Sequence, residues 1–79
     1  MALTNGVQLR AARAMLRLDL NELARLAGIA PNTLRTMESS DGRFSARVAT
    51  IRAVESVLTE RGIRFFNDNE PGARWRRPD

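Results

Sequence analysis

The stretch that decides the fold is residues 20–38, LNELARLAGIAPNTLRTME. Asp19, followed three residues later by Glu22, is typical of a capped helix N-terminus, so we expect a helix over residues 19–27. Gly28 can adopt the positive φ that ends this helix, and Pro31 suits the first turn of the next one, predicted over residues 31–38. The stretch therefore predicts two short helices that cross steeply at a tight turn.

The second of these helices has one apolar face and one polar face. Leu34 and Met37 share a side and are expected to pack inward, which leaves Asn32, Arg35 and Thr36 outward. An exposed helix fits the DNA major groove, where Asn can bind adenine through two hydrogen bonds and Arg can bind guanine O6 and N7. This face is therefore a candidate for direct base readout.

Two further helices are expected on either side of this stretch, because apolar residues recur at helical spacing. The first covers residues 5–17. A polar loop over residues 39–43 precedes the last helix, for which Ser45 is the expected N-cap and Gly62 the stop. The apolar positions are Leu9, Ala12 and Leu16 in the first helix and Val48, Ile51, Val54 and Leu58 in the last.

Beyond Gly62 the pattern changes to that of a β-hairpin. Residues 63–66 are β-branched and aromatic, residues 68–72 are turn-like, and residues 73–76 alternate again. We therefore expect a mainly α fold with a helical domain over residues 1–62 and a C-terminal hairpin and tail over residues 63–79.

Three of the four aromatic residues lie in the hairpin: Phe65, Phe66 and Trp75. This density is high for a solvent-facing hairpin, so we expect a partner to cover it. A second copy of the chain is the natural partner, and these three residues are the predicted dimer interface.

Composition limits the chemistry that the chain can perform. All 13 basic residues are Arg and the net charge is +4, which suits nucleic-acid binding and is equally compatible with a GC-rich genome. The absence of Cys and His removes disulfides, thiolate chemistry, most zinc sites and the commonest general base. We expect no enzyme activity, metal, cofactor or small-molecule ligand.

The expected location is the cytoplasm. The N-terminus, MALTNGVQLR, lacks the layout of a signal peptide, and no apolar run approaches the roughly 20 residues that a membrane span needs. No membrane partner is expected.

The segment LRAARAMLRLDLNELARLAGIAPNTLRTMES resembles the Cro/C1-type helix-turn-helix family, also called the xenobiotic response element family, and the resemblance covers residues 8–58. It implies a four-helix, lambda-repressor-like DNA-binding domain whose recognition helix is residues 31–38. The matching positions are Leu9, Arg13, Leu16, Leu23, Ala24, Ala27, Gly28, Leu34, Met37 and Glu38.

The resemblance also implies roles for individual residues. The implied base contacts are Pro31, Asn32, Arg35 and Thr36. The implied phosphate contacts are Asn21, Thr33 and Arg43, together with Arg17. The implied structural ion pair is Arg13 with Glu38, which would tie the first helix to the end of the recognition helix.

Two positions depart from the family pattern. Leu20 stands at a position where the family often has Gln, and that Gln contacts the DNA backbone. Leu20 cannot make this contact, so Asn21 and Arg17 would have to replace it. Ala30 stands where a Ser or Thr cap is frequent. The first departure affects affinity for DNA and leaves the expected fold unchanged.

Two functions remain open at this point. The first is a homodimeric transcriptional regulator, a repressor that occupies a palindromic operator with its recognition helices about 34 Å apart. The second is a protein-binding module of the same fold, such as an antitoxin or an anti-activator, which Leu20 and the aromatic hairpin favour.

Overall fold

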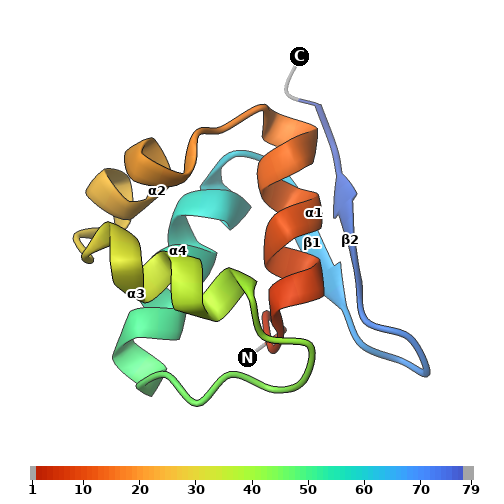
Figure 1. Cartoon of the computed structure of the whole chain (residues 1–79). Helices are drawn as coiled ribbons and strands as arrows, with labels where there is room; N and C mark the ends of the chain where they lie inside the picture. Colours follow the sequence, from red (N-terminus) through yellow and green to blue (C-terminus); the bar gives the residue numbers. More distant parts are fainter. Residues whose placement is uncertain (1, 78–79) are drawn as a thin grey trace.

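Four helices and a two-stranded antiparallel hairpin make up the computed structural model, which describes residues 2–77 (Figure 1). The elements are α1 (Gly6–Leu16), α2 (Leu20–Ala27), α3 (Pro31–Glu38), α4 (Val48–Glu60), β1 (Ile63–Phe66) and β2 (Gly72–Trp75). The mainly helical fold with a C-terminal hairpin, expected from the sequence, is confirmed in this outline.

Helix α1 is capped at both ends by local geometry. The Asn5 side chain accepts a hydrogen bond from the Gln8 amide at 3.1 Å, which satisfies one of the free N–H groups of the first turn. At the other end Arg17 adopts the left-handed conformation, with φ 52° and ψ 39°. Arg17 is the one non-glycine residue among residues 2–77 with a positive φ, and glycine suits that conformation better.

Helices α2 and α3 follow the pattern that the sequence predicts. Asp19 accepts hydrogen bonds from the amides of Asn21 and Glu22 at 3.0 and 3.3 Å, while the Glu22 side chain turns to Arg25 instead of completing the capping box. Gly28, with φ 71°, ends α2. Helix α3 then begins at Pro31 with no side-chain cap.

The start of α4 differs from the expectation. Ser45 does not cap it: the helix begins at Val48 and its N-cap, Arg47, makes no side-chain cap bond. The Phe44 amide donates to the Thr4 carbonyl at 3.0 Å, and Arg43 bridges to Asn5. This pairing holds the backbone extended at residues 43 and 44, just before the predicted cap.

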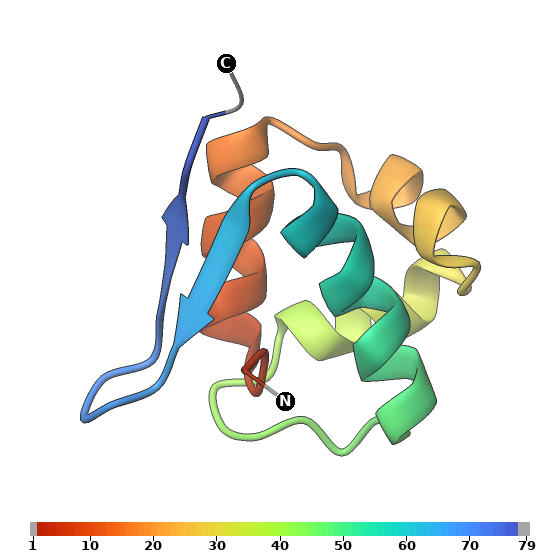
Figure 2. The same cartoon turned by 180° about the vertical axis from the view of Figure 1, so that it is seen from behind.

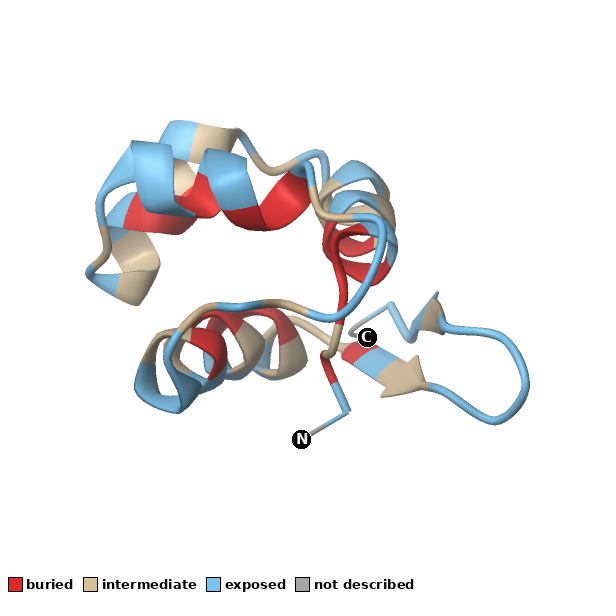
Figure 3. Ribbon diagram, turned by 60° about the horizontal axis from the view of Figure 1, so that its bottom comes forward, coloured by how far each residue is buried: buried red, intermediate tan, exposed pale blue. Residues whose placement is uncertain are grey.

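The core lies between the four helices and the start of the hairpin (Figure 3). Figures 1 and 2 show α1 between α3 on one side and the hairpin on the other. The buried apolar residues are Leu3, Leu9, Ala12, Leu23, Ala24, Leu34, Met37, Ile51, Val54, Val57, Leu58 and Ile63. Burial of these side chains is the main favourable term in folding a domain of this size.

The hairpin pairs Ile63 with Trp75 and Phe66 with Gly72. The second strand thus begins one residue earlier than the predicted 73–76, although Arg76 still donates its amide to the Gly62 carbonyl at 2.9 Å. Among residues 2–77 no helix is long and apolar enough to cross a membrane.

Candidate nucleic-acid interface

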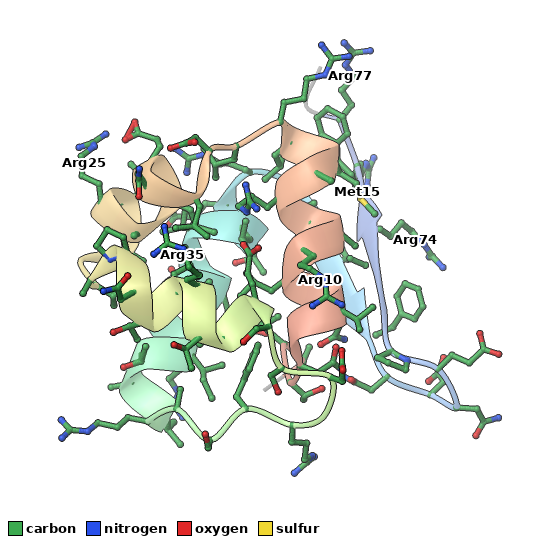
Figure 4. The ribbon with its side chains drawn as sticks, in the orientation of Figure 1. Arg10, Met15, Arg25, Arg35, Arg74 and Arg77 are labelled. Carbon is green, nitrogen blue, oxygen red and sulfur yellow. The ribbon has the colours of Figure 1, made fainter. Side chains whose placement is uncertain are left out.

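The outer face of α3 is a continuous polar surface. Leu34 is fully buried and Met37 is 4% exposed, so the opposite side of this two-turn helix is left to solvent. Arg35, labelled in Figure 4, is exposed on α3. The exposed residues of this face are Pro31, Asn32, Thr33, Arg35 and Thr36.

Two hydrogen bonds organise this face. Arg35 Nη1 donates to Asn32 Oδ1 at 2.6 Å, and Thr36 Oγ1 donates to the Asn32 carbonyl one turn earlier at 3.0 Å. The Thr36 hydroxyl hydrogen is therefore used within the helix, which leaves its oxygen lone pairs and methyl group outward. The four predicted base-contacting residues lie together, and three of them are linked by these two hydrogen bonds, both of which end on Asn32.

The C-terminal end of α3 is held to α1 by two arginines, Arg13 and Arg10. Arg13 Nε lies 2.5 Å from Glu38 Oε2 and Arg13 Nη2 lies 3.0 Å from Glu38 Oε1, which is a bidentate pair. Arg13 Nη1 also donates to the Leu18 carbonyl at 3.0 Å, and Arg10 donates to the Glu38 carbonyl. The structure thus brings together the two residues that the family resemblance pairs.

This contact is partly shielded from water. The side chains of Arg13 and Glu38 are 28% and 9% exposed. The hydrogen bond to Glu38 raises the pKa of Arg13, against the opposing effect of burial, so Arg13 keeps its charge across the pH range in which proteins fold. The pair ties the C-terminal end of α3 to α1.

The first turn of α1 also approaches the end of α3 closely. A Cβ atom on Gly6 would collide with the backbone carbonyl oxygens of Met37, Glu38 and Ser40. Glycine is therefore required here for space. This close approach and the arginine contacts both hold the C-terminal end of α3 against α1.

The predicted phosphate-contacting residues are all exposed and come from separate elements. Asn21 lies in the first turn of α2, Thr33 in the first turn of α3, Arg17 at the end of α1 and Arg43 in the segment after α3. The Asn21 and Thr33 amides are already bonded, to the Asp19 side chain at 3.0 Å and to the Ala30 carbonyl at 3.0 Å, so a phosphate contact at these two residues would come from their side chains.

Some of the other arginines are already paired. Arg25 bonds Glu22 at 2.5 Å, a contact that lowers the pKa of the Glu22 carboxyl and raises that of Arg25. Arg10, which Figure 4 shows on α1, lies 4.0 Å from Asp41 in addition to its bond with Glu38. Arg25 and Arg10 are therefore less free to bind an anion than Arg35.

Leu20 does not project as an apolar contact. It is half-buried and packs against the core. In the sequence, Leu20 favoured the protein-binding function, because an apolar residue stood where a polar one is frequent. The packing of Leu20 against the core removes this argument.

A shallow hollow of about 260 Å³ lies beside the polar face of α3. It is formed between α3 and the extended segment that follows, and the sequence offered no sign of it. Its lining residues are Thr33, Thr36, Met37, Ser40, Phe44, Ser45 and Ala46. None of them carries a charge, so the hollow has no side chain that would select an ionic ligand.

The hairpin aromatics are mostly covered by the chain itself. Phe65 packs against the core, Arg74 lies over the Phe66 ring with 5.4 Å between the guanidinium carbon and the ring centroid, and the Trp75 indole donates to the Arg61 carbonyl at 3.2 Å. Trp75 remains 37% exposed. The apolar area left for a partner is smaller than the sequence suggests.

Sequence reasoning missed Gln8, which is fully buried. Its Nε2 donates to the carbonyls of Phe66 and Gly72 at 2.9 and 3.3 Å and to Asn67 Oδ1, while its Oε1 accepts from the Thr4 amide at 2.8 Å. The available signal was its position four residues before Ala12, which places it on the buried side of α1. Gln8 is thus the polar anchor of the hairpin.

No protein-family profile and no curated protein sequence matches this chain. Within residues 2–77, no group of three acidic side chains lies close enough to hold a metal ion.

Proposed function

We propose that the protein is a sequence-specific DNA-binding regulator, whose α2 and α3 form a helix-turn-helix in a lambda-repressor-like domain. The observation that carries the proposal is the outer face of α3, where Asn32, Arg35 and Thr36 stand exposed on a helix whose other side is locked into the core. Such a helix can enter the major groove and reach base edges.

The rigidity of α3 supports this function. A recognition helix must present its side chains at a fixed angle, since direct readout depends on hydrogen bonds of narrow geometry. The bidentate contact between Arg13 and Glu38, with Arg10 on the same end of α3, supplies that fixed angle. The anchor lies away from the face that would meet DNA.

Charge supports the same function. The chain carries a net charge of +4, and the exposed Arg17 and Arg43, at the end of α1 and after α3, are suited to phosphate oxygens. If both of them bind phosphates, the affinity should fall with salt, with a log–log slope of about −0.9 per phosphate. A salt-independent affinity would contradict the proposal.

The mode of action we propose is repression by occupancy of a palindromic operator, with two copies of the chain joined through Phe65, Phe66 and Trp75. Sedimentation velocity should show a dimer that Trp75→Ala weakens. A wild-type chain that stays monomeric at the concentrations where it binds DNA would remove the hairpin from the proposal. It would leave the role of α3 intact.

Selection from a random pool of DNA duplexes tests the proposal. The protein should enrich a defined motif, and Arg35→Ala should lower its affinity for that motif by about 5- to 150-fold, since a bidentate Arg–base contact is worth about 1–3 kcal/mol. Arg52→Ala is the matched control, because Arg52 is an exposed arginine on α4 and belongs to neither α2 nor α3. Absence of enrichment, or equal losses in the two variants, would refute the proposal.

A protein-binding role is the second candidate, and the observation that favours it is the hairpin. Trp75 and Phe66 keep part of their surface available next to Arg64 and Arg74. Binding of a partner protein without enrichment of any DNA motif would support this candidate instead.

A further inference from the structure

The hydrogen bond between Arg35 and Asn32 bears on which base α3 reads. Both side chains are exposed and are separated by three positions on the helix, the spacing at which helical side chains meet. Taken separately, Asn32 would suit adenine and Arg35 would suit guanine. Taken as a bonded pair, they offer a different set of donors and acceptors.

Asn32 Oδ1 is the acceptor that an adenine contact would need. Adenine presents N7 as an acceptor and its N6 amino group as a donor, so a bidentate Asn must donate from Nδ2 and accept at Oδ1. In this structure Arg35 Nη1 lies 2.6 Å from Oδ1. The guanidinium charge beside that oxygen repels a second approaching donor, so the adenine contact is disfavoured.

The groups that remain outward are donors. Asn32 keeps both N–H bonds of Nδ2, and Arg35 keeps the N–H bonds of Nε, Nη2 and the second one of Nη1. In the major groove guanine is the base that presents two acceptors, N7 and O6, and no donor. The pair therefore matches guanine along its whole edge.

We propose that Asn32 and Arg35 act as one guanine-reading unit, in which Arg35 switches off the adenine-binding capacity of Asn32. This inference rests on the proposed function, because it assumes that α3 enters the major groove. It makes Arg35 a residue that sets specificity in two ways, by its own contact with guanine and by occupying the Asn32 acceptor.

The test compares motifs enriched from a random duplex pool by the wild-type protein, Arg35→Ala and the control Arg52→Ala. We expect the wild type to select guanine at the position read by α3. It should select no adenine through a contact with Asn32. Arg35→Ala frees Oδ1, so it should replace the guanine preference by an adenine preference at that position or its neighbour. Arg52→Ala should select the wild-type motif.

Binding measurements on the four base variants of the selected position give the size of the effect. Guanine should be favoured over adenine by about tenfold in the wild type, and adenine should be favoured in Arg35→Ala. The double variant N32A/R35A should favour neither, because it lacks both readers.

Other results would overturn the inference in distinguishable ways. If the wild type selects both a guanine and an adenine, and Arg35→Ala loses only the guanine while Asn32→Ala loses only the adenine, the two residues read independently and the inference fails while the proposed function stands. If no variant enriches any motif, the proposed function fails and the inference fails with it.

Discussion

The two exposed surfaces of this protein, the polar face of α3 and the hairpin, are held to the same helix by different chemistry. On one side of α1, Arg13 and Arg10 bind the end of α3 through Glu38. On the other side, the neutral and fully buried Gln8 binds the hairpin backbone. The charged anchor, Arg13 with Glu38, is partly exposed to solvent, whereas the neutral or dry anchor, Gln8, is fully buried. The loss of one anchor should therefore have different consequences from the loss of the other.

The largest effect is expected from the dry anchor. Gln8→Ala removes the partner of the Phe66 and Gly72 carbonyls and opens a cavity beside α1, so we expect a loss of about 3 kcal/mol in the free energy of unfolding. Urea denaturation measures this, with Val7→Ala as the control, because Val7 is 41% exposed on the same helix. Equal stability of the two variants would mean that Gln8 does not anchor the hairpin.

Hydrogen exchange sharpens this prediction. In Gln8→Ala under native conditions, amides of β1 and β2 should exchange faster, while those of α3 keep their protection, since each surface has its own anchor. Uniform acceleration over the whole chain would show that the two surfaces are coupled through the core.

A smaller loss is expected from the charged anchor. Glu38→Ala leaves Arg13 unpaired, which would be severe in a dry core, but the Arg13 side chain is 28% exposed and can take up water. We therefore expect about 2 kcal/mol, below the range for a fully buried pair. Glu38→Gln keeps an acceptor for Arg13 and should lose less. An unchanged melting temperature in Glu38→Ala would contradict the anchor.

The two anchors also differ in how far the sequence revealed them. The Arg13–Glu38 contact was visible because both residues match positions of a known family pattern. Gln8 was not, because its partners are backbone carbonyls more than fifty residues away and leave no mark on local periodicity. A polar residue on the buried side of an amphipathic helix is a signal only once its partner is known.

The same contrast holds for the fold. The helices α2 and α3 were predicted closely because Asp19, Gly28 and Pro31 set the helix ends through contacts and backbone angles that involve only residues close to them in sequence. The start of α4 was missed because Ser45 carries the local signal of a cap, whereas the helix begins at Val48 without any side-chain cap bond. The bond from the Phe44 amide to the Thr4 carbonyl, just before this segment, is long-range and left no sign in the sequence. The extent to which the hairpin aromatics are covered likewise depends on packing across the molecule.

The smallest expected effect comes from the C-terminal end of α1. Arg17 holds the left-handed conformation, so Arg17→Gly should stabilise the fold by about 0.5–1 kcal/mol. The same change removes a predicted phosphate contact and should weaken DNA binding. Thermal melting and DNA titration of the one variant separate these effects, and a destabilised Arg17→Gly would contradict the argument from conformation.

The measurement that tests the central claim most directly is a map of backbone amide NMR shifts during titration with the enriched DNA duplex. The account predicts the largest shifts in α3, from Asn32 to Thr36, with further shifts at the first turn of α2, and little change along β1. Largest shifts in the hairpin, with α3 unperturbed, would contradict it and would identify the hairpin as the nucleic-acid-binding surface.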